Sequence, residues 1–96
     1  MRELIEVLQQ SVDKLHGIFD RTDLEIECKK IQQKIQEARY NPGDVRPLAD
    51  CIFSLLLAAR NRGFSVDAVF KELAKVGAEN LNRRWKRMED GTYQSV

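Results

Sequence analysis

The sequence contains few of the residues on which metal centres, disulfides and nucleophilic catalysis usually depend. Its 96 residues include one histidine and two cysteines. Cys28 and Cys51 both fall on apolar positions of expected helices, and their spacing does not favour a metal site, so we expect reduced thiols in a cytoplasmic protein rather than a disulfide. His16 stands late on a polar helix face and is interpreted as a surface residue without a catalytic role.

The chain also lacks an excess of charge of either sign and any long apolar run. Sixteen Lys and Arg against fifteen Asp and Glu give a net charge of +1. This balance argues against general nucleic-acid binding but leaves room for a local basic patch. No apolar run reaches the roughly 20 residues of a membrane span, and Glu3 and Glu6 argue against a signal peptide. With no repeat or low-complexity segment, the length predicts a single domain over residues 1–96.

What the chain does have is one strongly apolar helical segment, residues 47–63. A helix that is apolar on most faces must be surrounded by neighbours, so we expect this one at the centre of a helical bundle. Asp50 is the acid that opens the segment. Burial of a carboxylate costs free energy unless the group is paired, hydrogen-bonded or metal-bound. The partner of Asp50 is therefore the central functional question.

Apolar spacing predicts helices over about residues 2–19, 23–40, 45–62 and 66–84. Short connections between them predict an all-α four-helix bundle of the up-and-down type, followed by an irregular C-terminal tail. Thr22 and Glu25 have the spacing of a capping box at the start of the second helix.

The Asn41-Pro42-Gly43-Asp44 turn makes a hairpin of the second and third helices, because proline disfavours helix in the residue before it. In this hairpin we expect Asp50 to lie beside Lys34, and to form an ion pair with Lys30 or Lys34.

Two stretches resemble one protein family. The run Leu48-Ala49-Asp50-Cys51-Ile52-Phe53, with Leu55-Leu56-Leu57-Ala58-Ala59-Arg60 and Gly63, is similar to the third helix of the MazG-like all-α nucleoside triphosphate pyrophosphohydrolases. Asn80-x-x-Arg83-Arg84-Trp85, followed by Asp90-Gly91 and Val96, resembles the ending of the dATP/dGTP diphosphohydrolase branch. Together these stretches cover about half of the chain.

The resemblance implies a MazG-like bundle, a homodimer or dimer of dimers, and a site built from acids. The family pattern is E-E-x-x-E on the second helix facing E-x-x-D on the third, which suits Mg²⁺ with retained waters and substrate phosphates. Its reaction releases pyrophosphate and a nucleoside monophosphate. For this chain the resemblance implies that substrate-binding residues would be Asn80, Arg83, Arg84 and Trp85.

Most of the family's acids are missing here. Asp50 matches the last acid of E-x-x-D, but the first falls on Pro47, and the five positions of E-E-x-x-E fall on Lys30-Ile31-Gln32-Gln33-Lys34. The resemblance thus implies a degenerate member in which Asp50 is a residual metal ligand, with no catalytic residue and no cofactor expected. A shifted register using Asp23 and Glu27 would place Glu27 about 10 Å from Asp50 along the helix axis. Val76 stands where the family often has a lysine.

Three functions remain open. The favoured one is a non-catalytic module that binds a (d)NTP or a protein. The second is an active (d)NTP pyrophosphohydrolase with Mg²⁺ and a rearranged set of acids. The third is a small regulatory bundle that binds nucleic acid or protein through Arg83 to Arg87, although nucleic acid is not the expected partner. The basic residues around Trp85 either anchor the tail or contact phosphate and bases.

The third helix also carries more apolar surface than its neighbours in one chain can cover. We expect Phe53 and Leu57 to be the uncovered residues, and we expect a homodimer or dimer of dimers to bury them.

Overall fold

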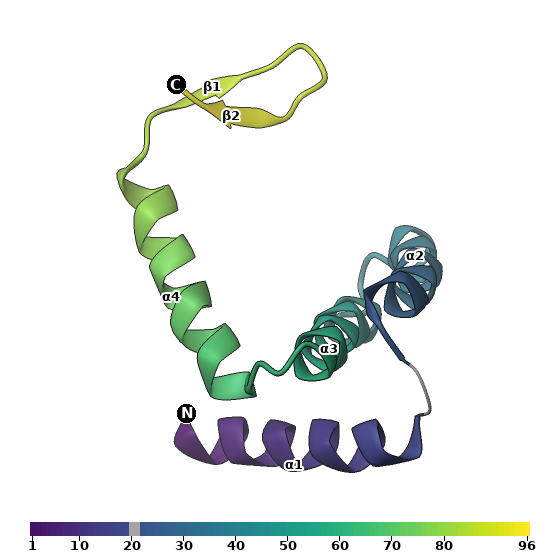
Figure 1. The fold of residues 1–96 in the computed structure, drawn as a ribbon. Coiled ribbons are helices and arrows are strands. Elements are labelled where there is room, and N and C mark those ends of the chain that lie inside the picture. Colours follow the sequence, from purple (N-terminus) through teal and green to yellow (C-terminus); the bar gives the residue numbers. More distant parts are fainter. Residues whose placement is uncertain (20–21) are drawn as a thin grey trace.

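The computed structural model describes residues 1–19 and 22–96, and in them it contains four helices and one strand pair. The helices are α1 (Arg2–Ile18), α2 (Leu24–Tyr40), α3 (Arg46–Asn61) and α4 (Val66–Asn82), and the strands are β1 (Trp85–Arg87) and β2 (Tyr93–Ser95) (Figure 1). The prediction of four helices in an all-α protein is confirmed. Each helix ends within two residues of its expected bounds. No helix among the described residues has the length and hydrophobicity to cross a membrane.

The second helix begins with a different cap from the expected one. The Asp23 side chain is the N-cap, and its Oδ1 accepts a hydrogen bond from the Ile26 backbone N–H at 2.9 Å. Thr22 makes no capping box with Glu25; its hydroxyl instead donates to the buried carboxylate of Glu27. An aspartate is as good an N-cap as threonine, so placing the helix start one residue later leaves Thr22 for another contact.

The third helix is the centre of the fold, as its composition predicts. It packs along α2 over most of its length, and α1 and α4 also contact it. The fully buried hydrophobic residues come from α1, α3 and α4: Val12, Leu56, Leu57, Ala58 and Val66. Figure 1 shows α1 running across the α2–α3 pair rather than alongside it.

The uncovered residues of α3 differ from the expected ones. Leu57 is buried in the core and Phe53 packs against it, so the prediction that these two are left over is wrong. The exposed apolar residues of α3 are instead Leu48, Ile52 and Leu55. The crossing α1 covers the helix face that carries Phe53 and Leu57, and leaves this other face open.

The fourth helix joins the core only through its first turns. Ser65 caps it by accepting a hydrogen bond from the Ala68 N–H, and Val66 is buried. From residue 71 to the end of the chain, every residue is exposed. We call residues 71–96 the arm. Figure 1 shows the arm pointing away from α2 and α3, with the strand pair at its far end.

The chain end is more regular than the expected irregular tail. Strands β1 and β2 pair antiparallel, with Trp85 opposite Ser95 and Arg87 opposite Tyr93. The turn between them contains Gly91 at φ +90°, a conformation that favours glycine. The Asp90 carboxylate accepts hydrogen bonds from the Thr92 N–H and hydroxyl at 3.0 and 2.7 Å. This Asp-Gly pair is a typical hairpin signal.

Candidate functional site

The α2–α3 hairpin brings Asp50 against α2 in the expected register. The Asp44 N–H donates to the Asn41 carbonyl at 3.0 Å and closes the turn. One turn into α3, the Cys51 thiol donates to the Ile31 carbonyl of α2 at 3.7 Å. These contacts place Asp50 next to Lys34, and the predicted register is therefore confirmed.

Each oxygen of the Asp50 carboxylate faces a cation. Lys34 Nζ lies 3.5 Å from Oδ2, and Arg46 Nε donates to Oδ1 at 3.3 Å. The predicted ion pair with Lys34 is confirmed. Lys30, the other predicted partner, places its ammonium group 5.4 Å from the centre of the Phe19 ring. Asp50 is thus neutralised by two basic side chains, one from each helix of the hairpin.

Lys34 extends this arrangement to a second acid. Its Nζ lies 3.3 and 3.4 Å from the two carboxylate oxygens of Glu37. The hydrogen bond with Glu37, supported by the nearby Asp50, holds the pKa of Lys34 above its ordinary value. We call Lys34, Glu37, Arg46 and Asp50 the charge cluster. It contains two acids and two bases, so its formal charge is zero.

A second acid on α2, Glu27, is buried, which was not predicted from the sequence. Glu27 is 3% exposed, and its Oε2 accepts a hydrogen bond from Thr22 at 2.5 Å, while Oε1 has no hydrogen-bond partner in the described part of the chain. Its spacing could have indicated this, because Glu27 follows Leu24 by three residues and precedes Ile31 by four, on the same helix face. Since Asp23 caps the helix and Glu27 bonds Thr22, neither residue joins Asp50.

No metal-binding group forms among residues 1–19 and 22–96. In these ranges, no three His, Cys, Asp or Glu side chains lie close enough together to hold a metal ion. His16, expected at the surface, is partly buried, and its Nδ1 has no hydrogen-bond partner among these residues. Hard divalent cations need several converging oxygen ligands, and Glu37, which shares Lys34 with Asp50, is already hydrogen-bonded to that ammonium group.

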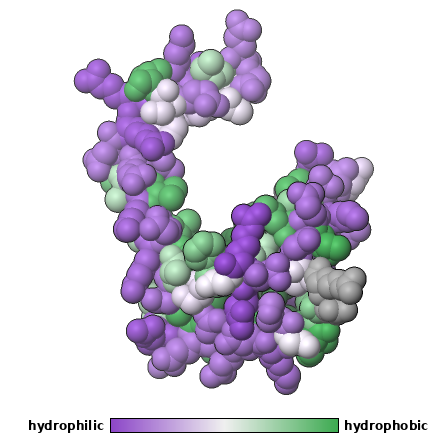
Figure 2. Space-filling view, viewed as in Figure 1, coloured by the Kyte–Doolittle hydropathy of each residue, from purple (hydrophilic) through white to green (hydrophobic). Residues whose placement is uncertain are grey.

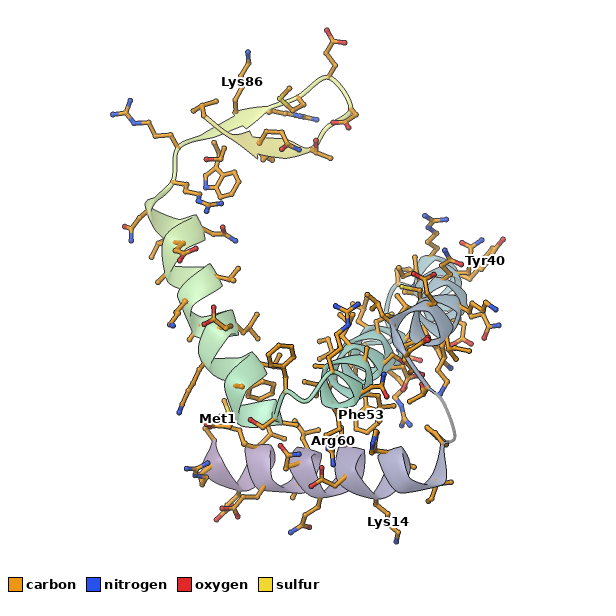
Figure 3. The ribbon with its side chains drawn as sticks, viewed as in Figure 1. Met1, Lys14, Tyr40, Phe53, Arg60 and Lys86 are labelled. Carbon is orange, nitrogen blue, oxygen red and sulfur yellow. The ribbon has the colours of Figure 1, made fainter. Side chains whose placement is uncertain are left out.

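The four residues implied to bind substrate gather at the end of α4. The Trp85 indole N–H donates to the Asn80 carbonyl at 2.9 Å. Arg83 caps α4, with Nη2 3.9 Å from Glu79, and the Arg84 carbonyl accepts from the Val96 N–H. All four side chains are exposed on the arm. Figure 3 shows the end of α4 and the strand pair far from the α2–α3 hairpin.

A groove of about 450 Å³ lies beside the charge cluster, between α1 and α3. It is lined by apolar residues that include Leu8, Phe53 and Leu56, and by Arg46 and Asp50. The groove is thus apolar with one ion pair at its edge. Such a surface suits the apolar side chains of a protein segment better than a triphosphate.

Comparison with family models, with curated proteins and with solved structures finds no match to this chain.

Proposed function

We propose that this chain is a degenerate MazG-like protein that associates with itself and binds a nucleotide or a protein without hydrolysing it. The observation that carries the proposal is the neutralised Asp50. The residues around it resemble the third helix of MazG-like pyrophosphohydrolases, whose corresponding acid faces other acids across the hairpin. Here it faces Lys34 and Arg46.

The charges explain why hydrolysis is not expected. A divalent cation at Asp50 would have to displace both basic groups and would be repelled by them. The nearest acid on α2, Glu37, is hydrogen-bonded to Lys34 and cannot reach the metal without releasing it. Without bound Mg²⁺, the chain has no group here that neutralises a triphosphate and activates water.

The arm supplies the groups with which a (d)NTP could still be bound. Arg83 and Arg84 offer exposed guanidinium groups for phosphate oxygens, and Trp85 offers a partly exposed ring for stacking on a base. The hydrogen bond from Trp85 to Asn80 fixes the ring relative to α4. Nucleotide binding by these residues would need no metal.

Titration calorimetry with a panel of dNTPs, with and without Mg²⁺, tests this proposal together with an assay for released pyrophosphate. We expect no pyrophosphate release, and dNTP binding that does not depend on Mg²⁺. The double variant Arg83→Ala with Arg84→Ala should weaken that binding at least tenfold. Arg62→Ala, which removes an exposed guanidinium group distant from the arm's end, should leave it unchanged.

Hydrolysis by the wild-type protein that disappears in Asp50→Asn would contradict the proposal and favour the active enzyme with rearranged acids. Binding of nucleic acid that falls steeply with added salt would instead favour the regulatory bundle.

A further inference from the structure

One chain exposes far more surface than a folded monomer of its mass. Its accessible surface is 7765 Å², whereas the scaling for folded monomers gives about 5,700 Å² for 11.1 kDa. Its radius of gyration is 15.6 Å, against about 12.5 Å expected for a compact chain of this length. The excess of about 2,100 Å² falls within the roughly 1,000–2,500 Å² per subunit of obligate homodimers. The excess therefore has the size of an interface.

Part of this excess is an apolar stripe along the arm. Val66 and Phe70 pack into the core from the first turns of α4. Leu73 and Leu81 continue this face along the helix, three and eleven residues after Phe70, and Val76 lies at its edge. These three side chains are 46% to 84% exposed. We call them the arm stripe.

A second apolar stripe runs along α3. Leu48, Ile52 and Leu55 recur at the spacing of one helix face, and each is between 51% and 57% exposed. Neither α1, which covers Phe53 and Leu57, nor α2, which faces Asp50 and Cys51, covers them. We call these three residues the α3 stripe. At 1.5 Å per residue, it spans about 10 Å and the arm stripe about 12 Å.

The arm cannot easily cover the α3 stripe of its own chain. The Val66 N–H donates to the Gln9 side chain of α1 at 2.8 Å, and buried Val66 anchors α4 there. This anchor directs the arm away from α3 (Figure 1). Figure 2 shows hydrophobic side chains on the inner side of α4 and between α4 and α3, facing the open side of the molecule.

We infer that the arm of one copy lies on the α3 stripe of a second copy, and that the second copy's arm does the same in return. This inference names the interface of the self-association proposed above and rests on that proposal. In a dimer with two-fold symmetry, the arm stripe of each copy can contact the α3 stripe of the other, because each copy offers both surfaces and the two stripes have similar lengths. The paired contacts would bury a part of the excess surface that is apolar on both elements. They also carry Trp85 and its neighbouring arginines to the second copy.

Disulfide trapping tests the pairing directly. The native cysteines are first removed by Cys28→Ala and Cys51→Ser. One tagged copy then carries a single cysteine in the α3 stripe (Leu48→Cys, Ile52→Cys or Leu55→Cys). A differently tagged copy carries a single cysteine in the arm stripe (Leu73→Cys, Val76→Cys or Leu81→Cys). Mild oxidation should give cross-linked hetero-tagged dimers for at least one of the nine pairs. Lys75→Cys, on the polar face of α4, should give none with any of the three.

Sedimentation analysis of the unmodified protein and of charged variants distinguishes a failure of self-association from a failure of this particular interface. Ile52→Glu and Val76→Glu should each weaken dimerisation at least tenfold, and Lys75→Glu should not. A wild-type monomer at high micromolar concentration would overturn self-association itself. A stable dimer that cross-links only between identical positions, or not at all among the nine pairs, would overturn this interface and leave self-association standing.

Discussion

At the scale of single residues, the charge cluster decides whether this protein can hold a metal. Lys34 lies between Glu37 and Asp50, within 3.5 Å of both carboxylates. Replacement by an acid would therefore place three carboxylates together where one ammonium group now separates two. One of the side chains that neutralise Asp50 is thus the one whose substitution by an acid should create a cation site.

We expect Lys34→Glu to gain stabilisation by Mn²⁺ or Mg²⁺ that the wild-type protein lacks. At a metal concentration ten times the dissociation constant, binding to the folded state would add about 1.4 kcal/mol to the free energy of unfolding. Thermal unfolding with and without the metal measures this stabilisation. Lys30→Glu is the matched control, because Lys30 lies over Phe19 rather than against Asp50. If both variants or neither respond to metal, the assignment of Lys34 as the blocking residue is wrong.

A second prediction at this scale concerns acid stability. The hydrogen bond from Arg60, with a smaller contribution from Gln9, holds the pKa of Asp13 below its ordinary value of 3.8. Because the pKa is lower in the folded state, this stabilisation is present above pH 3.8 and is lost as the pH falls through the folded-state pKa. Asp13→Asn should therefore lower the Tm at pH 7 and make its fall below pH 4 shallower. The control is Glu6→Gln, on the same helix.

A third prediction concerns the buried hydrogen bond between Thr22 and Glu27. Thr22→Val removes the hydrogen bond to Oε2 and should cost about 1–3 kcal/mol in the free energy of unfolding. Thr22→Val combined with Glu27→Leu should be less destabilising than Thr22→Val alone, because no carboxylate is then left buried without its partner. Urea denaturation measures both. If the double variant is the less stable of the two, Glu27 has another role in the fold.

At the scale of elements, the sequence predicts helices better than it predicts what ends or covers them. The four helices and the register that sets Asp50 beside Lys34 follow from apolar spacing and from the turn at Pro42. The sequence does not predict the strand pair, although Asp90-Gly91 is a hairpin signal, because strands of three residues have too few positions to show an alternating pattern. The partner of Leu57 could not be foreseen, since successive leucines look alike until the crossing angle of α1 is known.

The start of α2 allows a direct test of the cap. Asp23→Ala should cost about 1 kcal/mol in the free energy of unfolding, since it leaves the Ile26 N–H without its side-chain acceptor. Glu25→Ala, which would remove half of the capping box predicted from the sequence, should change stability much less. Denaturant unfolding of the two variants decides between the caps. A larger loss of stability in Glu25→Ala than in Asp23→Ala would show that the capping box, and not Asp23, caps α2.

At the scale of the whole molecule, the exposed arm links folding to assembly. The core joins α1, α3 and the start of α4, while residues 71–96 contribute no buried residue to it. The arm stripe is hard to identify from the sequence, because the first turns of the same helix face point into the core. The α3 stripe is hard to identify because α3 is apolar on most of its faces. Only the direction of α4, fixed by Val66 and Gln9, shows which turns are left uncovered.

The last prediction follows from this link. If two copies bury the stripes against each other, unfolding also separates them, so the Tm of the wild-type protein should rise with protein concentration. Each tenfold increase adds about 1.4 kcal/mol per dimer to the free energy of unfolding. In Val76→Glu, the carboxylate would have to be buried against leucine and isoleucine in the dimer. The Tm of this variant should therefore not depend on protein concentration. The control Lys75→Glu should show the same concentration dependence as the wild type. Calorimetry from 5 to 500 μM measures the slope, and a wild-type Tm that stays constant over this range would show that one copy folds without the other.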